Sequence, residues 1–506
     1  MNRTKSFFYN TISSIILQAV ITVSGFITPK IMLTFYGSQI NGLTNSILQF
    51  ISYFSLVEAG LASAAVYALY KPLSEHDHKQ INGIITAAKN FYIYSGYIFT
   101  GLTVFLAVLY PFYIKSDALT SKQMFVLILI LGVNGALDFF TLAKYRVLLT
   151  ADQKSYVISI ASAVHILLST AVIICLSYAR VDIVLLRLAA ASTILIRSLI
   201  LVFYCKKKYR FLDYHETPNN AVLDKRWNAL YLQILGSIHT SAPVVLLTLI
   251  LKDLTVVSIY AVFNMIIAGI NGLLTLLANA SGASFGNLLS LQEHVHFKKA
   301  YQEFELFYYN LITFVYSVTF ITIMPFIKIY TQDITDTNYY LPSIGFLFVL
   351  NALLYNIKTP QGILLIAAGL FKESRWQTTF QGLLAVGIGF FLTPKLQIAG
   401  VLIGLIISNI YRDIDLIRFI PRYLPMLTSR PTIFRIIRLL AATALVTLPF
   451  QLFPVTVTNY PAWIVLALAA SFLSLAVIFI FDFVFDRQDM KLLLLRIHTL
   501  LCRKEN

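Results

Sequence analysis

Long apolar runs place the tightest limit on how this chain folds. A run of about 20 apolar residues is long enough to cross a bilayer as a helix, and such runs fill almost the whole sequence. Only 12% of the residues are charged and 58% are hydrophobic, whereas a soluble domain carries about 25% charged residues. The runs are also much longer than the ~10-residue alternating strands of an outer-membrane barrel. The expected fold class is therefore an all-α polytopic membrane protein.

Fourteen membrane spans are expected from these runs. Their approximate limits are 8–33, 42–70, 90–112, 123–148, 156–178, 182–204, 227–250, 255–284, 304–327, 341–369, 376–393, 398–420, 433–452 and 462–484.

The distribution of Lys and Arg predicts the orientation. Loops on the cytoplasmic side collect basic residues. With the N-terminus inside, 29 of the 39 basic residues fall on the cytoplasmic side, 7 outside and 3 within spans. Both termini are therefore expected to be cytoplasmic. Basic loops that face an anionic leaflet account for the net charge of +16 without a nucleic-acid partner.

One short pattern occurs twice, 218 positions apart. "ASAAVYALYKPLSEHDHKQ" (Ala62–Gln80) aligns without a gap on "ASGASFGNLLSLQEHVHFK" (Ala280–Lys298), so that Glu-His-x-His recurs. Histidines at i and i+2 are poorly spaced for a metal on a helix, and matched neighbours have no ligand role. No metal is expected. The pattern instead predicts a duplicated chain with two six-span halves in the same orientation, as in parallel-repeat transporters.

The expected organisation has five parts. They are an N-terminal six-helix lobe (1–204), a cytoplasmic linker (205–226), a C-terminal six-helix lobe (227–420), two additional spans (433–484) and a cytoplasmic amphipathic tail (485–506). The tail contains Asp489–Arg503, which is apolar on one side and basic on the other, and it is expected to lie on the inner leaflet.

Ionisable residues at span depth are the candidate functional residues, because a charge in the membrane usually has a function or a partner. The candidate cations of an anion-binding cavity are Lys358 and Arg197 near the midplane, and Arg187 and Lys30 nearer the outer surface. Lys358 and Arg197 have no acidic neighbour in their own spans, and phosphate suits Arg through bidentate hydrogen bonds. The alternatives are that Lys358 reaches solvent down an aqueous cleft without touching substrate, and that Arg187 and Lys30 snorkel to the outer surface.

Four further residues are candidates for coupling to H⁺ or Na⁺. They are Glu58, Asp138, His165 and His239, all near the middle of their spans. The alternative for each histidine is a neutral, hydrogen-bonded core residue.

Three prolines are candidate hinges, because Pro removes a helix hydrogen bond and kinks the helix. Pro29 and Pro243 lie in the first span of each half, and Pro360 lies in the tenth span. The alternative is that they are merely tolerated, since Pro is common in membrane helices.

The run Asn10–Leu73 resembles Wzx-type polysaccharide flippases, which belong to the multidrug/oligosaccharidyl-lipid/polysaccharide (MOP) exporter superfamily. "YGSQINGL" at Tyr36–Leu43 and "EAGLASA" at Glu58–Ala64 carry most of the similarity. The fourteen-span plan covers the rest. The resemblance implies a MATE-like fold with two six-helix lobes in a V shape around a central cavity.

The resemblance also implies a function. Such proteins move undecaprenyl-pyrophosphate-linked oligosaccharide repeat units from the inner to the outer leaflet of a bacterial cytoplasmic membrane, by alternating access. Flipping breaks no bond, so neither an enzyme activity nor a cofactor is expected. Membrane lipids, a polysaccharide polymerase and glycosyltransferases are the implied partners. The alternatives are a lipid II or teichoic-acid precursor exporter, a drug exporter of the same superfamily, or a membrane polysaccharide polymerase.

Overall fold

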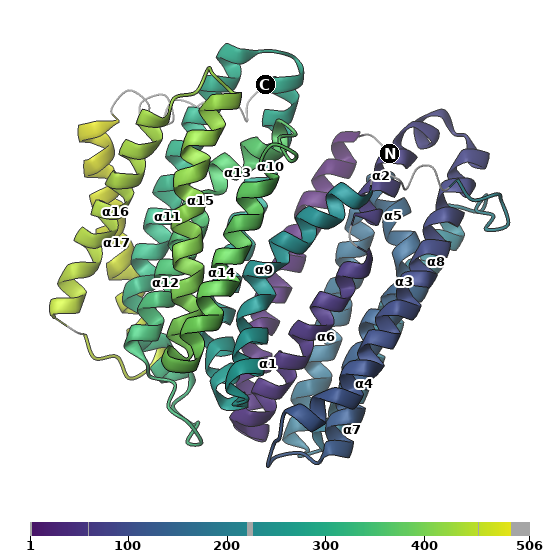
Figure 1. The fold of residues 1–506 in the computed structure, drawn as a ribbon, viewed down its shortest axis with the longest axis horizontal. Coiled ribbons are helices and arrows are strands. Elements are labelled where there is room, and N and C mark those ends of the chain that lie inside the picture. Colours follow the sequence, from purple (N-terminus) through teal and green to yellow (C-terminus); the bar gives the residue numbers. More distant parts are fainter. Residues whose placement is uncertain (1–2, 59, 220–225, 454, 487–506) are drawn as a thin grey trace. The chain divides into compact units, whose positions relative to one another are not determined.

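The computed structural model describes residues 3–58, 60–219, 226–453 and 455–486, and every regular element among them is a helix (Figure 1). This confirms the expected all-α fold class. The expected tail, Asp489–Arg503, lies outside these residues. The chain forms two compact units, Met1–Met265 and Ile266–Asn506. Their boundary lies inside a helix beyond the expected linker, and the expected lobe limits stay a prediction.

The element bounds follow the chain in order. The first unit contains α1 (Arg3–Phe54), the 3₁₀ helix η1 (Ser55–Glu58), α2 (Leu61–Glu75), α3 (His78–Tyr113), α4 (Ser121–Leu137), the π-helix η2 (Asp138–Leu142), α5 (Ala143–Ala151), α6 (Ser155–Tyr178), α7 (Ile183–Ser192), α8 (Ile194–Lys208) and α9 (Arg226–Leu251). After α10 (Leu254–Ser290), which crosses the boundary, the second unit contains α11 (His294–Tyr330), α12 (Pro342–Ile357), α13 (Thr359–Ala367), α14 (Arg375–Leu396), α15 (Ile398–Tyr423), α16 (Ser429–Leu452) and α17 (Tyr460–Phe485).

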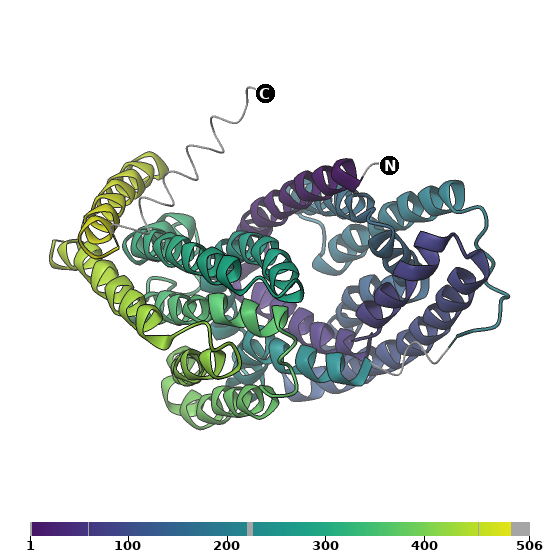
Figure 2. The ribbon, with the colours of Figure 1, turned by 90° about the horizontal axis from the view of Figure 1, so that it is seen from above.

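Ten helical stretches of the described chain are long and apolar enough to cross a membrane, and Figure 2 shows the helices of each unit nearly end-on. One of the ten, Phe8–Glu75, covers two expected spans. The expected tenth span is divided into α12 and α13, which are each short, and α15 carries a charged second half. The expected seventh span is represented only by the shorter apolar helix Thr240–Leu251. With the merged first stretch, these differences account for ten stretches in place of fourteen, and the exact span count stays a prediction.

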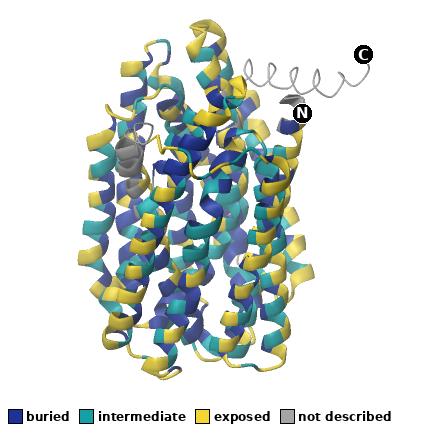
Figure 3. Cartoon of the chain, turned by 90° about the vertical axis from the view of Figure 1, so that its right-hand side faces the viewer, coloured by how far each residue is buried: buried dark blue, intermediate teal, exposed yellow. Residues whose placement is uncertain are grey.

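Large apolar side chains cover the outer faces of the helices. Figure 3 shows exposed and buried residues sharing the same helices. On α8, Leu199 is 68% exposed and Phe203 is 72% exposed. Patches of this kind on a helix bundle indicate contact with lipid hydrocarbon rather than water.

The two Glu-His-x-His runs occupy equivalent places, each at a tight junction between long helices. The first joins α2 to α3, where His76 has a left-handed backbone (φ 56°) and the Asp77 side chain accepts the Gln80 N–H at 2.9 Å. The second joins α10 to α11, where Gln292 is also left-handed (φ 57°). Both runs thus lie at helix junctions, but the left-handed residue is His76 in the first and Gln292, the counterpart of Ser74, in the second, so the duplication stays a prediction.

The motif Tyr36–Leu43 joins the two membrane-crossing parts of α1. Gly37 is the non-helical residue inside α1 (φ 81°, ψ 172°), a conformation that side-chain-bearing residues rarely adopt. The Tyr36 hydroxyl donates to the Val181 carbonyl at 2.7 Å, which fixes the turn to the residues before α7.

Gly42 of the same motif permits close contact between α1 and the start of α10. A Cβ atom at Gly42 would lie 1.8 Å from the Leu254 carbonyl oxygen. Beside it, the Asn41 amide donates to the Ser258 hydroxyl at 2.7 Å in a buried position. Small residues at membrane interfaces let backbones approach in this way.

The tightest helix pair of the second unit is α14 with α15. A Cβ atom at Gly400 would lie 2.5 Å from the Leu392 carbonyl carbon, and one at Gly404 would lie 2.7 Å from the Gly389 nitrogen. The four-residue spacing places both glycines on one face of α15, which permits this close contact with α14.

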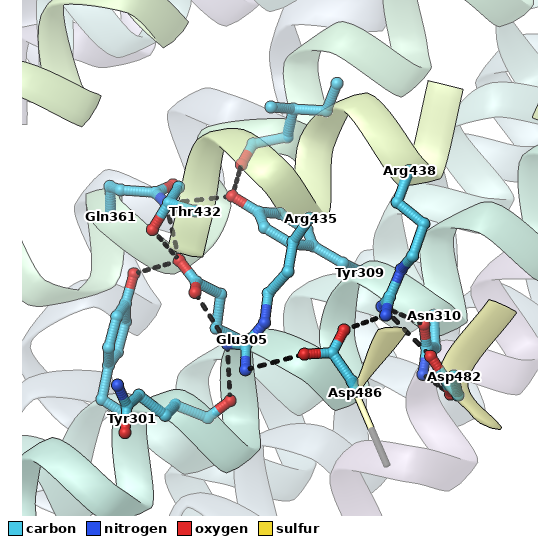
Figure 4. A network of polar contacts seen from close by, with 12 residues as sticks. Tyr301, Glu305, Tyr309, Asn310, Gln361, Thr432, Arg435, Arg438, Asp482 and Asp486 are labelled. Atoms are coloured by element: carbon cyan, nitrogen blue, oxygen red, sulfur yellow. Dashed lines mark hydrogen bonds and ion pairs between the residues drawn. The ribbon is translucent and has the colours of Figure 1, made fainter. Parts of the chain in front are cut away.

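A buried polar network attaches α16 to α11 and α13 (Figure 4). Arg435 Nη1 lies 2.9 Å from Glu305 Oε2, and both side chains are at most 3% exposed. The other carboxylate oxygen of Glu305 accepts hydrogen bonds from Thr432 (2.7 Å), Tyr301 (3.0 Å) and Gln361 (3.1 Å). A charge buried in a low-dielectric interior is stable only when an opposite charge and hydrogen-bond donors or acceptors surround it in this way.

The same network continues to the last helix. Arg438 Nη2 lies 3.1 Å from Asp482 Oδ1, and Arg438 also pairs with Asp486 just after α17. Asn310 of α11 donates to Asp482 at 2.6 Å. Charged contacts thus hold α16 and α17 against α11.

We expect Gly42→Ala to destabilise the first unit, because its new Cβ atom would collide with backbone that has no flexible end to move. Overpacking of this kind costs about 1–3 kcal/mol. Thermal unfolding in detergent measures the effect. The control is Gly101→Ala on α3, which has open space around it and should keep or slightly raise the melting temperature, since Ala favours helices. Equal melting temperatures for the two variants would contradict the close approach.

We expect Arg435→Ala to lower the stability of the second unit by about 3–5 kcal/mol, because it leaves the Glu305 carboxylate buried without its cation. Arg430→Ala is the control, since Arg430 is exposed on the same helix. The double variant Glu305→Met/Arg435→Met removes both charges and should recover much of the loss. The same thermal unfolding measurement tests this, and an Arg435→Ala variant as stable as wild type would refute the role of the pair.

Candidate functional site

A cavity of about 450 Å³ lies within the first unit. Segments of α1, α6 and α7 line it, together with residues of α9 and the start of α10. Its polar lining residues are Ser24, Thr28, Asn41, Thr44, Asn45, Gln49, His165, Ser169, Thr170, Arg187 and Asn264. No Asp or Glu belongs to the described lining. The cavity therefore combines hydroxyl and amide groups with a single fixed cation.

Arg187 supplies that cation from α7. The Asp182 side chain caps this helix by accepting the Val184 N–H at 2.8 Å, so the position of Arg187 is fixed one turn along a well-defined helix. Its Nε atom is buried without a hydrogen-bond partner, and no carboxylate among the described residues forms an ion pair with it. Such a charge at membrane depth is costly unless it binds something.

Arg197 does have acidic neighbours. Its Nη1 atom lies 3.7 Å from Asp138 Oδ1. Asp138 also lies 3.0 Å from Arg146, whose other terminal nitrogen is 3.2 Å from Glu58. The four residues form one ion-pair chain, Glu58–Arg146–Asp138–Arg197, with two acids and two bases. The chain is neutral overall, and all four side chains are 16–28% exposed.

Interrupted helices position this ion-pair chain. Glu58 ends the 3₁₀ helix η1, and Gly60 beyond it is left-handed (φ 81°). Asp138 opens the π-helix η2. Short 3₁₀ and π segments inside longer helices occur often at functional sites. Arg146 was not among the residues expected from the sequence, because it lies among basic residues near the inner end of its span. Its spacing of eight residues from Asp138, about two helical turns, was the available signal.

Of the remaining candidates of the first unit, some line the cavity and others do not. His165 lines the cavity, and its Nδ1 atom lies 2.9 Å from the Thr193 hydroxyl. Pro29 also lines the cavity, whereas Lys30 is not among the lining residues. His239 and Pro243 lie in α9, and the His239 side chain is outside the part of the chain that the structure describes. The expected coupling and hinge roles stay predictions.

Lys358 lies in the second unit, between α12 and α13, where Pro360 begins the next helix. Its ammonium hydrogen-bonds to the Asn409 side-chain oxygen and lies 4.5 Å from the centre of the Tyr355 ring. Asp413, one turn after Asn409 on α15, attracts the ammonium electrostatically.

Asp413 was missed in the sequence, because it lies among charged residues near the inner end of its span. The acidic partners that Arg197 and Lys358 lack in their own spans thus come from other helices. Of the three cations Arg187, Arg197 and Lys358, only Arg187 has no acidic partner in the described chain.

Comparison with known proteins places the fold. No protein-family model and no curated protein matches the sequence. Three solved structures are similar across most of the chain. The lipid II flippase MurJ in an inward closed conformation has a TM-score of 0.69 and 14% identity, covering 94% of this chain and 98% of its own. An inward-facing multidrug resistance MATE family transporter of the MOP superfamily has a TM-score of 0.65 and 14% identity, covering 82% and 98%.

The third is a MOP superfamily transporter from Pyrococcus furiosus, with a TM-score of 0.60 and 16% identity, covering 83% of this chain and 96% of its own. That protein is described as having a binding pocket of reverse polarity, which suggests a different function for it. All three are transporters or flippases. Together with the long apolar helices, they identify this chain as a multi-pass membrane protein with the fold of MOP superfamily transporters.

Proposed function

We propose that this chain is a flippase that moves undecaprenyl-pyrophosphate-linked oligosaccharide units from the inner to the outer leaflet of a bacterial cytoplasmic membrane, for assembly of a cell-surface polysaccharide. The observation that carries the proposal is Arg187, a cation without an acidic partner in the described chain that lines a polar cavity of about 450 Å³. Transport proceeds by alternating access, with both termini in the cytoplasm.

The chemistry of the cavity suits such a headgroup. A guanidinium binds phosphate oxygens through two parallel hydrogen bonds. The amides of Asn41, Asn45, Gln49 and Asn264 can both donate to and accept from sugar hydroxyls. The volume falls within the range of ordinary ligand sites. A pyrophosphate with attached sugars cannot shed its hydration in hydrocarbon, and these groups replace part of it.

Two of the alternative substrates remain compatible with this cavity. A lipid II or teichoic-acid precursor presents a similar phosphate headgroup, and a lipid II flippase is among the structures of similar fold. A cationic drug, as exported by a multidrug transporter, is disfavoured because an unpaired arginine would repel it. Glycosyltransferases and a polysaccharide polymerase encoded beside the gene would favour the oligosaccharide unit.

The ion-pair chain is the proposed coupling element. Protonation of Glu58 or Asp138, or Na⁺ binding to either, would release Arg146 from one of its two partners. The chain joins η1, η2, α5 and α8, so a change in its pairing acts on two helix interruptions and two helices together. In the other unit, Asp413 acts electrostatically on Lys358 without a direct ion pair, and it is a second candidate acid for coupling.

Deletion of the gene in its host, followed by complementation, tests the function. We expect lipid-linked precursor to accumulate on the inner leaflet and surface polysaccharide to disappear. Arg187→Ala should restore transport about 10- to 100-fold less well than wild type, since a hydrogen bond to a charged group contributes about 1.5–3 kcal/mol. Precursor sidedness and surface polysaccharide are the measurements.

The controls separate the site from the function. Arg418→Ala removes an exposed arginine and should complement fully, and Arg187→Lys should restore transport only in part. Normal polysaccharide after deletion, in a host without a second exporter, would refute the flippase. Full rescue by well-expressed Arg187→Ala would refute the binding site alone.

We expect Glu58→Gln to uncouple transport from the ion gradient, because the amide resembles a protonated carboxyl and no longer titrates. Initial rates in proteoliposomes, with and without an imposed proton or sodium gradient, measure this. The gradient-dependent increase should vanish in Glu58→Gln and persist in Glu75→Gln, a change at a surface pair with Lys71. An unaltered gradient response in Glu58→Gln would remove the ion-pair chain from the coupling mechanism.

A further inference from the structure

Three lysines from three different helices gather at one end of the first unit, beneath the segment 209–219 that follows α8. They are Lys89 of α3, Lys144 of α5 and Lys206 of α8. The ammonium nitrogens of Lys89 and Lys144 lie 5.2 Å and 4.8 Å from the centre of the same Tyr214 ring. These two nitrogens are therefore no more than about 10 Å apart, and the charges of Lys89 and Lys206 both act on Lys144.

No carboxylate neutralises this lysine cluster within the described chain. The nearby Lys154 differs, because it forms an ion pair with Asp152. The two acidic residues of the covering segment do not form ion pairs with these lysines. Asp213 accepts the backbone N–H of His215 at 2.9 Å, and Glu216 forms no ion pair with the lysines. Three like charges are thus held together without internal compensation.

The covering segment is firmly attached, so Tyr214 is fixed over the lysines. The Asn82 amide donates to the Phe211 carbonyl at 3.0 Å, and the Asn219 N–H donates to the Gly83 carbonyl at 3.1 Å. In Figure 1 this segment is the teal loop beside the upper ends of α3 and α8.

Tyr214 contributes an aromatic face and no negative charge. Burial raises the pKa of its phenol, and a hydrogen bond with Tyr145 raises that pKa further, so the group is neutral. Lys144 also lies 5.2 Å from the centre of the Tyr145 ring. The rings attract the ammonium groups and limit their directions, but they leave the positive charges unneutralised.

Unpaired lysines that are partly buried attract an anion strongly, because the surrounding protein screens their charges less than bulk water does. Lys89 and Lys144 are half-buried, and Lys206 is exposed at the rim. Ammonium groups act as point charges that suit the several oxygens of a phosphate group. In the expected topology this end of the unit faces the cytoplasm, where the inner leaflet presents phosphate headgroups of anionic lipids.

We propose that Lys89 and Lys144, held under Tyr214, form with Lys206 at the rim a binding site for the phosphate headgroup of an anionic lipid in the inner leaflet. This site is separate from the Arg187 cavity, and it does not depend on the proposed transport activity. Its occupant neutralises the lysine cluster and fixes this end of the first unit at the membrane surface.

Native mass spectrometry of the full-length protein tests the site. The protein is purified in detergent with equal amounts of phosphatidylglycerol and phosphatidylcholine, and the lipids retained are counted. Wild type should retain phosphatidylglycerol preferentially. Lys89→Gln/Lys144→Gln should lower that retention about tenfold or more, as expected for the loss of charge-assisted hydrogen bonds. Lys207→Gln/Lys208→Gln, which removes two exposed lysines beside the site, should leave it unchanged.

A folding check and a competition with inorganic phosphate complete the experiment. Thermal unfolding without phosphatidylglycerol checks that the variants fold, and Lys206→Gln, at an exposed position, replaces the double variant if that one does not. Equal phosphatidylglycerol retention by wild type and variants would overturn the proposal. Displacement of phosphatidylglycerol by millimolar inorganic phosphate, with lysine-dependent stabilisation by inorganic phosphate alone, would overturn the lipid assignment in favour of a soluble phosphate source.

Discussion

The structure depends on one constraint, which is that hydrocarbon cannot solvate a charge or an open backbone group. Several buried charges in the described chain are accordingly met by charges or amides from other helices, whereas Arg187 is not. Glu305 has Arg435, Asp482 has Arg438, and Lys358 has Asn409. These contacts also decide which helices pack together, since each partner comes from a different element. The last two helices, α16 and α17, contact α11 through such pairs and through an apolar cluster that includes Ile321, Val446 and Leu466.

The same constraint makes the interruptions of helices informative about function. An interruption leaves backbone groups without their usual partners, so it is costly in a membrane unless the surroundings satisfy them. Three interruptions coincide with ionisable residues, at Glu58 in η1, Asp138 in η2 and Lys358 between α12 and α13. Broken helices of transporters commonly surround their substrate and ion sites. The coincidence of charge and interruption is the structural reason to assign coupling to these positions.

The sequence was sufficient for features that depend on local pattern. Apolar run length predicted an all-helical membrane protein, because the length of such a run alone decides whether a helix can cross a bilayer. Pairing between helices could not be read in this way. Arg146 and Asp413 were assigned to charged segments near inner span ends, yet they partner residues from other helices, because pairing depends on which helices become neighbours. The collision that any side chain at Gly42 would cause with Leu254 is likewise visible only once α10 is in place.

The two cationic sites differ in a way that fits two different tasks. Arg187 is a rigid, planar donor in a partly open cavity lined with amides, so it can select both the geometry of a phosphate and the hydroxyls attached beyond it. The lysine cluster under Tyr214 has flexible point charges, one of them exposed, and aromatic rings in place of amides. It can bind any anionic phosphate headgroup, but it has few groups that could distinguish what is attached to the phosphate. Selectivity for the transported molecule therefore belongs to the cavity, whereas the lysine cluster suits the abundant lipids of the surrounding leaflet.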